Sequence, residues 1–255
     1  MANDQRRTTN DLLLYYITDR TAFAPDEPTR RRRLLEKIAE AARGGIDYIQ
    51  LREKDLSSAE LESLTREAVQ TVRAARRLAP GPWPQAPALL VNSRTDVALA
   101  ADAEGVHLRS DDVSPREVIA VWRRAHVGTA ALGCTAGQSP ATAAAATRES
   151  SNQQPLVGVS CHTPAEVRQA ADSGATFAVF APVFQKKDAP DTEPKGLAQL
   201  HEACKAKIPV LALGGVTLEN AKQCLEVGAS GIAAIRLFQE NDVAKTVEIV
   251  RQVPR

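Results

Sequence analysis

The chain has 255 residues, of which 44% are hydrophobic, so it can bury a substantial core. Chains of roughly 200 to 250 residues commonly form one α/β barrel, and a single domain is expected. Its 32 basic and 31 acidic residues leave a formal charge of +1, which excludes a global field that would attract nucleic acid or an anionic membrane.

The first eleven residues, MANDQRRTTND, predict a polar tail before a domain at 12–255, and they lack the apolar core of a signal peptide. No later run approaches the roughly 20 apolar residues of a membrane span. We therefore expect a cytoplasmic protein that binds neither membranes nor nucleic acid. The cysteines form no CxxC pair, and reduced thiols are favoured over zinc ligands at Cys134, Cys161, Cys204 and Cys224.

Short apolar runs alternate with helical patterns along the whole chain, which is typical of repeated βα units on a parallel sheet. The eight predicted strands are LLLYYIT (12–18), DYIQLR (47–52), ALLVN (88–92), GVHL (105–108), PLVGVS (155–160), FAVFAPV (177–183), PVLALG (209–214) and GIAAIRL (231–237). In the segment after the first strand, Leu34, Ile38 and Ala41 share one helical face. This alternation predicts a single (β/α)₈ TIM barrel.

Two further patterns refine this expectation. Hydroxyl and acidic residues at capping distance predict helix starts at Ser57 with Glu60, Thr163 with Glu166 and Thr217 with Glu219. The stretch 127–154, rich in Ala, Ser, Thr and Gln, interrupts the rhythm before the fifth strand. We predict an insertion there, either with a short strand and helix of its own or partly mobile.

The active site of such a barrel lies at the carboxyl ends of its strands, so polar residues at those ends are candidates. They are Gln50, Arg52 and Lys54 at the second strand, Asn92 and Ser93 at the third, His107, Asp111 and Asp112 at the fourth, Ser160, Cys161 and His162 at the fifth, Gln185, Lys186 and Lys187 at the sixth, Gly214 and Gly215 at the seventh, and Arg236 on the eighth. The alternate spacing of Gln50, Arg52 and Lys54 predicts that all three share one strand face.

These residue types favour a phosphorylated substrate. Guanidinium and ammonium groups pair with phosphate oxygens, and a glycine pair at a helix start lets a phosphate approach the backbone. Asp111 or Asp112 could bind a metal held jointly with a diphosphate. His107, inside a short apolar strand, is interpreted as a packed core histidine, whereas His162 at a strand end is favoured as functional. The glycine pair is equally consistent with ordinary turn chemistry.

Taken together, the strand ends resemble the thiamin phosphate synthase and TenI family. The resemblance covers residues 12 to 253 and depends on motifs in the family's order: YYITDR, YIQLREKD, VNSRTDVALAADAEGVHL, GVSCHT, APVF, PVLALGGVT and GASGIAA. It implies an enzyme that couples hydroxymethylpyrimidine diphosphate to thiazole phosphate, giving thiamin phosphate and pyrophosphate. Small phosphorylated pyrimidine and thiazole substrates are then expected, and the sequence allows a homo-oligomer.

The resemblance also implies roles for individual residues. Gln50, Arg52, Lys54 and Asn92 match the positions that bind the diphosphate and pyrimidine, and Asp112 matches a Mg²⁺ ligand. Ser160 matches the serine of the GVSxHT element, and Lys54 and Ser160 are expected to be catalytic. The glycine pair that binds the thiazole phosphate matches Gly214 and Gly215.

Several positions depart from the synthase pattern. Ser93 replaces an aspartate, the sixth loop keeps only Lys186 or Lys187 for substrate binding, and Arg236 replaces a serine near the thiazole phosphate. The TenI branch therefore offers an alternative, a metal-free thiazole tautomerase that would use His162 for proton transfer. A non-catalytic phosphate-binding protein is a third interpretation. The synthase is preferred because Gln50, Arg52 and Lys54 would be costly to bury without a ligand.

Overall fold

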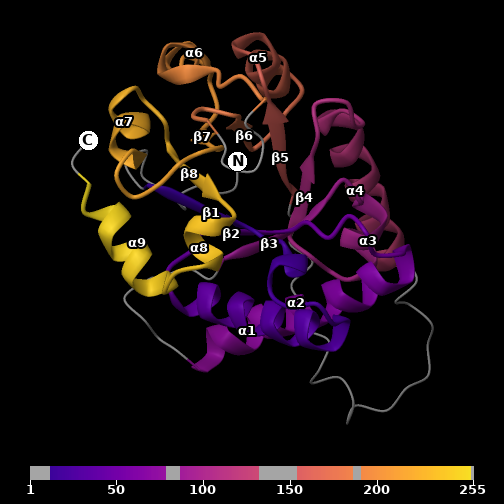
Figure 1. The fold of residues 1–255 in the computed structure, drawn as a ribbon. Coiled ribbons are helices and arrows are strands. Elements are labelled where there is room, and N and C mark those ends of the chain that lie inside the picture. The colour runs from indigo at the N-terminus through magenta and orange to yellow at the C-terminus, as the bar shows by residue number, and fades with distance from the viewer. Residues whose placement is uncertain (1–11, 79–86, 132–153, 186–190, 254–255) are drawn as a thin grey trace, which may run out of the picture.

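The computed structural model describes residues 12–78, 87–131, 154–185 and 191–253. Within these ranges, eight parallel strands close into one barrel in chain order (Figure 1). They are β1 (Leu13–Ile17), β2 (Tyr48–Leu51), β3 (Ala88–Asn92), β4 (Gly105–Leu108), β5 (Leu156–Cys161), β6 (Phe177–Phe180), β7 (Val210–Ala212) and β8 (Gly231–Ala234). The predicted TIM barrel is confirmed.

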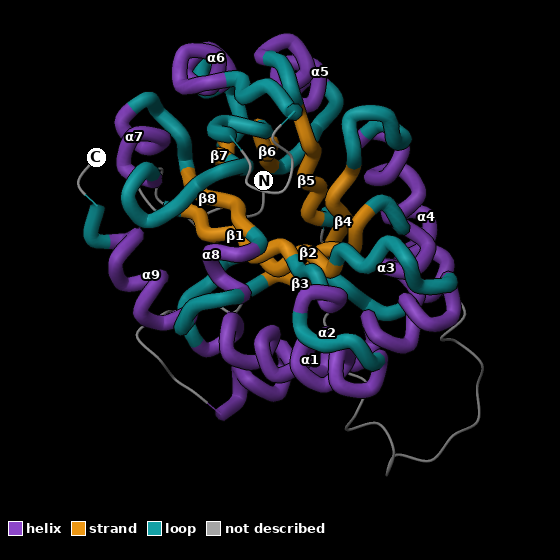
Figure 2. The backbone as a smooth tube through the Cα atoms, in the orientation of Figure 1, coloured by secondary structure: helices purple, strands orange, loops and turns teal. Residues whose placement is uncertain are grey.

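Helices surround the barrel, and Figure 2 shows them as an outer ring around the strands. They are η1 (Arg20–Ala22), α1 (Glu27–Arg43), α2 (Ser58–Leu78), α3 (Thr95–Ala100), α4 (Pro115–Ala131), α5 (Pro164–Asp172), α6 (Gly196–Ala203), α7 (Ala221–Glu226), α8 (Arg236–Gln239) and α9 (Val243–Arg251). Among the residues described, no helix combines the length and the apolar character that a membrane crossing needs.

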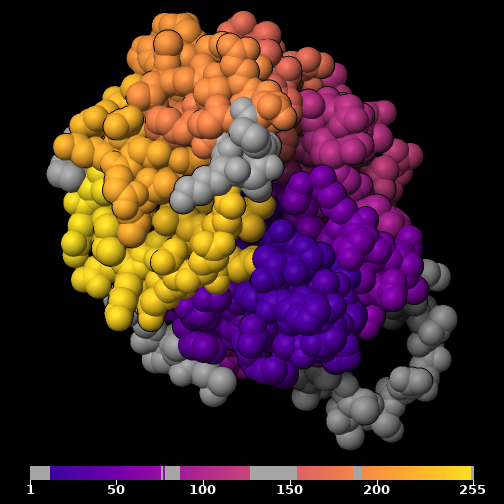
Figure 3. All heavy atoms as spheres, viewed as in Figure 1, coloured from indigo at the N-terminus to yellow at the C-terminus, as the bar shows by residue number. Residues whose placement is uncertain are grey.

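The barrel is closed by contacts between its first and last elements. Tyr15 on β1 pairs in register with Ala233 on β8. Outside the strands, the Val243 backbone N–H donates to the Glu40 carboxylate at 2.8 Å, across 203 positions of sequence. Figure 3 shows the indigo and yellow ends of the chain packed against each other. Closure of the barrel therefore joins the first and last elements of the described chain.

The inside of the barrel is filled by side chains. Its buried apolar members are Leu13, Tyr15, Ile17, Tyr48, Leu90, Phe177, Val179, Leu211 and Ala233. The Tyr48 and Phe177 rings stack with their centroids 4.8 Å apart. A Cβ on Gly158 would lie 2.5 Å from the Phe177 ring and 2.8 Å from Nδ1 of His107, so this glycine makes room for both rings. The filled interior supports the residues at the carboxyl ends of the strands, which we call the barrel mouth.

Helix starts follow the predicted capping pattern at two of three places. Side chains cap α2 and α5 as predicted, with Ser57 Oγ accepting from the Glu60 N–H at 3.4 Å and Thr163 Oγ1 accepting from the Glu166 N–H at 3.2 Å. The third prediction is wrong. The Thr217 N–H donates to Oδ1 of Asn220 at 2.8 Å, and α7 begins only at Ala221, because this asparagine completes a turn before the helix.

Five predicted strands end earlier than expected: the first at Ile17, the sixth at Phe180, the seventh at Ala212, and the second and eighth, which bear on the site. The second strand ends at Leu51, so Arg52 and Lys54 lie beyond it rather than on its face. The eighth ends at Ala234, and Arg236 is the first residue of α8, so its predicted place on a strand is wrong. The apolar run was interpreted as a strand because Leu237 and Phe238 are apolar, but they are buried as the inner face of a helix.

The range predicted to be an insertion overlaps a helix at its start. Helix α4 extends to Ala131, so residues 127–131 continue a helix instead of belonging to the insertion. The rest of the predicted insertion, with Cys134, lies outside the described residues, apart from its last residue at 154.

Candidate active site

A chain of hydrogen bonds crosses the ends of three neighbouring strands. Gln50 at the end of β2 donates from Nε2 to Oδ1 of Asn92 at 2.8 Å. Asn92 donates to Oγ of Ser93 at 3.2 Å, and Ser93 donates to Oδ2 of Asp112 at 2.6 Å. Ser93 has a φ of 57°, a left-handed conformation that is uncommon outside glycine. The predicted residues Gln50, Asn92 and Asp112 are thus brought together.

Gln50 has an unusual feature for a buried side chain. It is only 2% exposed, and its Oε1 has no hydrogen-bond partner among the described residues. A buried polar atom without a partner costs about 1–3 kcal/mol. Because Nε2 is already used by Asn92, this oxygen is an acceptor that a bound molecule could satisfy.

Asp112 is fixed by three contacts around its carboxylate. Oδ2 accepts from Ser93 Oγ and, at 2.7 Å, from the Arg109 backbone N–H, while Nε of Arg109 lies 3.4 Å from Oδ1. Burial alone would raise the pKa of Asp112, but the hydrogen bonds from Ser93 and Arg109 bring it below its ordinary value. The carboxylate is therefore ionised and held in place at neutral pH.

Asp112 fits a magnesium ion better than Asp111 does. Asp111 is 70% exposed, whereas Asp112 is 14% exposed and belongs to the hydrogen-bonded chain. No group of three or more His, Cys, Asp or Glu that could hold a metal occurs in the described ranges. Magnesium commonly takes one or two carboxylates and completes its shell with phosphate oxygens and water. Asp112 suits that mode of binding.

Arg52 and Lys54 lie in the turn after β2. The Arg52 backbone N–H donates to Oγ1 of Thr18 at 3.0 Å, which anchors the turn to the end of β1. The pKa of Lys54 is lowered, first by the charge of Arg52, then by partial burial and by the charge of Arg109. The two predicted cations are close together, although a turn rather than a strand face places them.

Between these two cations, Glu53 points the other way, into the protein. It is 5% exposed and lies 3.4 Å from Nη1 of Arg20, which is itself buried. Arg20 also binds both oxygens of Asp55, at 2.6 and 3.0 Å. Burial raises the pKa of Glu53, against the opposing effect of its hydrogen bonds from Thr18 and Arg20. Sequence reasoning missed this cluster, although the alternation of charges in REKD was a signal for it.

His107 lies inside the barrel, as predicted for a core histidine, but it also contacts a candidate residue. Its Nδ1 and the Tyr15 hydroxyl are hydrogen-bonded at 3.0 Å, and its Nε2 and Ser160 Oγ are hydrogen-bonded at 2.8 Å. Burial, reinforced by the charge of Arg52, lowers the pKa of His107 to about 3 despite the opposing charge of Asp112. The imidazole is therefore neutral at neutral pH and holds Ser160 at the mouth.

His162 and Cys161 lie apart from this network. Nδ1 of His162 is hydrogen-bonded to the Ala181 carbonyl at 2.8 Å, and the described residues include no contact from its ring to Ser160 or Asp112. The Cys161 side chain is buried among the outer core residues, and burial raises its thiol pKa to about 12. Along with Cys204 and Cys224 it is a free thiol. Neither residue joins the chain that begins at Gln50.

Gly214 and Gly215 both have left-handed backbones, with φ values of 95° and 66°. A Cβ on Gly215 would lie 2.5 Å from the Gln185 carbonyl oxygen, and the Gly214 carbonyl accepts from the Phe184 N–H at 2.9 Å. The pair therefore allows the loops after β6 and β7 to touch, whatever else it binds. Arg236 is exposed at the start of α8, and Lys186 and Lys187 lie outside the described residues.

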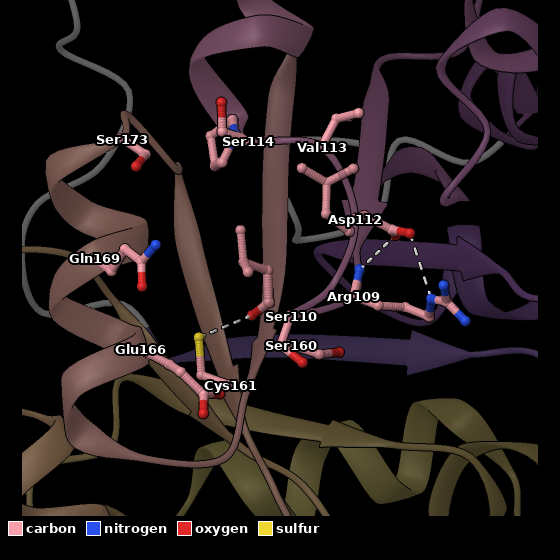
Figure 4. Close-up of a pocket in the computed structure, with 13 residues that line it drawn as sticks. Arg109, Ser110, Asp112, Val113, Ser114, Ser160, Cys161, Glu166, Gln169 and Ser173 are labelled. Atoms are coloured by element: carbon pink, nitrogen blue, oxygen red, sulfur yellow. Dashed lines mark hydrogen bonds and ion pairs between the residues drawn. The ribbon is translucent and has the colours of Figure 1, made fainter.

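A cavity of about 110 Å³ lies beside the hydrogen-bonded chain, between the loop after β4 and helix α5. Figure 4 shows Arg109 and Asp112 at one side of it and Cys161 and Glu166 at the other. Pockets for drug-sized ligands are typically about 300–1,000 Å³, so this cavity is too small for two ring-containing substrates. It is a side pocket of the barrel mouth.

Comparisons with known proteins agree on one family. The family model for thiamine monophosphate synthase matches residues 14–136 and 131–238. A thiamine-phosphate synthase of Syntrophomonas wolfei is 32% identical over 249 residues, 96% of this chain and 97% of the relative. One of Roseiflexus castenholzii is 33% identical over 225 residues, 88% and 79% of the two chains. The structure of thiamine phosphate pyrophosphorylase from Pyrococcus furiosus has a TM-score of 0.67 and 27% identity, covering 96% of each chain.

Proposed function

The chain belongs to the thiamine monophosphate synthase family, and we propose that it is the enzyme that couples hydroxymethylpyrimidine diphosphate to thiazole phosphate. The products are thiamin phosphate and pyrophosphate. The observation that carries this proposal at the site is the position of Arg52 and Lys54 in the turn that directly follows Gln50, which is hydrogen-bonded to Asn92. The cations can bind a diphosphate, and the neighbouring hydrogen-bonding groups can bind a heterocycle attached to it.

In the proposed reaction, the bond between the pyrimidine methylene carbon and the diphosphate oxygen breaks, and its electron pair leaves with pyrophosphate. The lone pair of the thiazole nitrogen then forms a bond to the resulting carbocation. Arg52 and Lys54 stabilise the charge that builds on the leaving group. Asp112 is the residue that would hold Mg²⁺, whose chemistry here is neutralisation of diphosphate charge.

Other residues orient the substrates in this proposal. Gln50 Oε1, which no described group pairs with, accepts a hydrogen bond from the pyrimidine substrate, and Asn92 fixes the Gln50 amide. Ser160, held by the neutral imidazole of His107, presents its hydroxyl toward the reacting groups. Backbone N–H groups around Gly214 and Gly215, with Arg236, bind the thiazole phosphate. Lys186 or Lys187 would supply a further cation from the sixth loop.

The tautomerase alternative is less well supported. It requires His162 to transfer a proton, and it has no need of Arg52, Lys54 and an ionised Asp112 arranged around one mouth. The curated relatives described above are synthases by name. We therefore assign His162 no step in the coupling reaction, although it was a predicted catalytic residue.

Pyrophosphate release tests the proposal. Purified protein incubated with the pyrimidine diphosphate, thiazole phosphate and Mg²⁺ should release pyrophosphate, and excess EDTA should stop the reaction. His162→Asn should retain the activity, whereas Arg52→Ala should lose most of it. Absence of product at saturating substrate would refute the coupling function. Aromatisation of a thiazole tautomer that survives EDTA and disappears in His162→Asn would establish the alternative instead.

We further propose one domain at 12–255, a cytoplasmic location and no nucleic-acid or membrane partner, supported by the balanced charge of +1. The sequence also allows a homo-oligomer, and size-exclusion chromatography with light scattering would measure the oligomeric state.

A further inference from the structure

Arg109, the first residue after β4, has a guanidinium group that is only partly used. Its side chain is 56% exposed. Within the described residues, its ion pairs run through Nε, which lies 3.2 Å from Oδ1 of Asp111 and 3.4 Å from Oδ1 of Asp112. Among the described residues, its side-chain hydrogen bond is made by Nε, and none is made by the two terminal nitrogens. The outer edge of the guanidinium is therefore available to a ligand.

The guanidinium of Arg109 is held at its Nε by the carboxylate of Asp112. Asp112 is anchored by Ser93 Oγ and by the Arg109 backbone N–H, so the carboxylate that holds Nε does not depend on the Arg109 side chain. Figure 4 shows Arg109 on the side of Asp112 that faces away from Cys161 and Glu166. A planar guanidinium held at Nε can bind two oxygens of a phosphate through its free edge, with little further loss of side-chain entropy.

Arg109 also lies near the cations of another loop. The hydrogen-bonded chain from Gln50 through Asn92 and Ser93 to Asp112 joins the end of β2 to the residue that Arg109 contacts. The charge of Arg109 is also one of the causes that lower the pKa of Lys54, after Arg52 and burial. Arg52 and Lys54 follow β2, whereas Arg109 follows β4, and the loop after β3 with Asn92 and Ser93 lies between them. Like charges gathered at one mouth repel, and an anion bound among them relieves the repulsion.

We propose that Arg109 is a third cationic ligand of the substrate diphosphate, binding it from the loop after β4 while Arg52 and Lys54 bind it from the loop after β2. The inference rests on the proposed synthase function. An exposed arginine that pairs with a neighbouring carboxylate is ordinarily a solvated surface group, and Arg66 on α2 is one: it is 52% exposed and pairs with Glu62 at 2.7 Å. Arg109 differs because its partner Asp112 is hydrogen-bonded to Ser93 and through it to the strand ends that carry Asn92 and Gln50.

Calorimetric titration with inorganic pyrophosphate in the presence of EDTA tests this role without turnover. Arg109→Gln should weaken pyrophosphate binding about tenfold, the size of one lost charge-assisted contact, and Arg109→Lys should recover part of it. Arg66→Gln, matched in exposure and pairing, should bind like the unmodified protein. Thermal unfolding of each variant checks that the fold is retained, which is expected because Arg109 contacts Asp112 through its backbone as well.

Two results would overturn the inference, and they differ from each other. If Arg52→Ala weakens pyrophosphate binding but Arg109→Gln does not, the diphosphate site exists and Arg109 is only a surface residue. If neither variant weakens binding, or if the unmodified protein binds pyrophosphate neither in EDTA nor with Mg²⁺, the diphosphate site of the proposed function is itself wrong.

Discussion

Ser160 Oγ lies 2.8 Å from Nε2 of His107, and the two residues come from neighbouring strands 53 positions apart in sequence. The other ring nitrogen of His107 is hydrogen-bonded to the hydroxyl of Tyr15. A candidate catalytic hydroxyl is thus held by a buried imidazole, which is in turn held by a buried phenol. The inner packing of the barrel and the chemistry at its mouth are connected through this histidine.

His107 should make the protein less stable in mild acid. Its pKa is about 3 in the folded protein against 6.5 in the unfolded chain, so between these values only the unfolded chain takes up the proton. Stability should therefore fall as the pH drops below 6.5. From pH 7 to 5 this one group contributes a loss of roughly 2 kcal/mol, at about 1.4 kcal/mol per pH unit. Urea unfolding at both pH values measures it.

The matched control is His201→Gln, which removes an exposed histidine on α6 and should leave the pH dependence unchanged. His107→Gln should be less stable at pH 7 but lose less stability on acidification. An equally steep loss in His107→Gln would show that other groups cause the acid sensitivity.

Asp112 and Asp111 are adjacent, but only Asp112 is expected to govern magnesium dependence. Asp112→Asn removes the ionised carboxylate beside Ser93, so the Mg²⁺ concentration for half-maximal pyrophosphate release should rise about tenfold or more. Asp111→Asn, at a residue 70% exposed, should change it little. Equal shifts in both variants would assign the effect to overall charge rather than to a ligand position.

Arg20 should contribute far more to stability than an exposed arginine. Arg20→Ala would leave the buried carboxylate of Glu53 without its cation, and breaking a buried ion pair costs about 3–5 kcal/mol. Arg94→Ala, which removes a surface pair with Asp96, should cost at most about 1 kcal/mol. Urea denaturation of the two variants gives the comparison. Similar losses in the free energy of unfolding would mean that the Arg20 cluster stabilises the protein no more than a surface ion pair does.

A comparison with Gly196 can distinguish two reasons for a glycine at position 215, the close approach of another loop and the positive φ. Both have positive φ, but a Cβ on Gly196 meets nothing within 4 Å, whereas one on Gly215 would lie 2.5 Å from the Gln185 carbonyl. Gly196→Ala should cost about 1–2 kcal/mol from backbone strain alone. Gly215→Ala should cost clearly more and weaken thiazole phosphate binding in a calorimetric titration. Equal costs would refute the steric argument.

The sequence predicted the barrel well because its signal is local. Strands and helices are specified by the spacing of apolar residues, and eight alternations close in one common way. The residues at the strand ends were predictable for the same reason, once the strands had been counted. Errors arose where a local pattern had two meanings. The run that includes Arg236 is apolar both as a strand and as a buried helix, and Lys54 alternates with Gln50 although the strand stops between them.

The sequence by itself determined the fold class and the family, and it nominated Gln50, Asn92 and Asp112. Only the tertiary structure decided which of the nominated groups meet. Asp112 was distinguished from Asp111, and His107 was found to hold Ser160, by contacts between the ends of neighbouring strands, over 19 and 53 positions of sequence. The buried pair of Arg20 and Glu53 had a similar origin. Periodicity reports which side of an element is buried, but the partner of a side chain depends on strand register and barrel closure, which no local pattern contains.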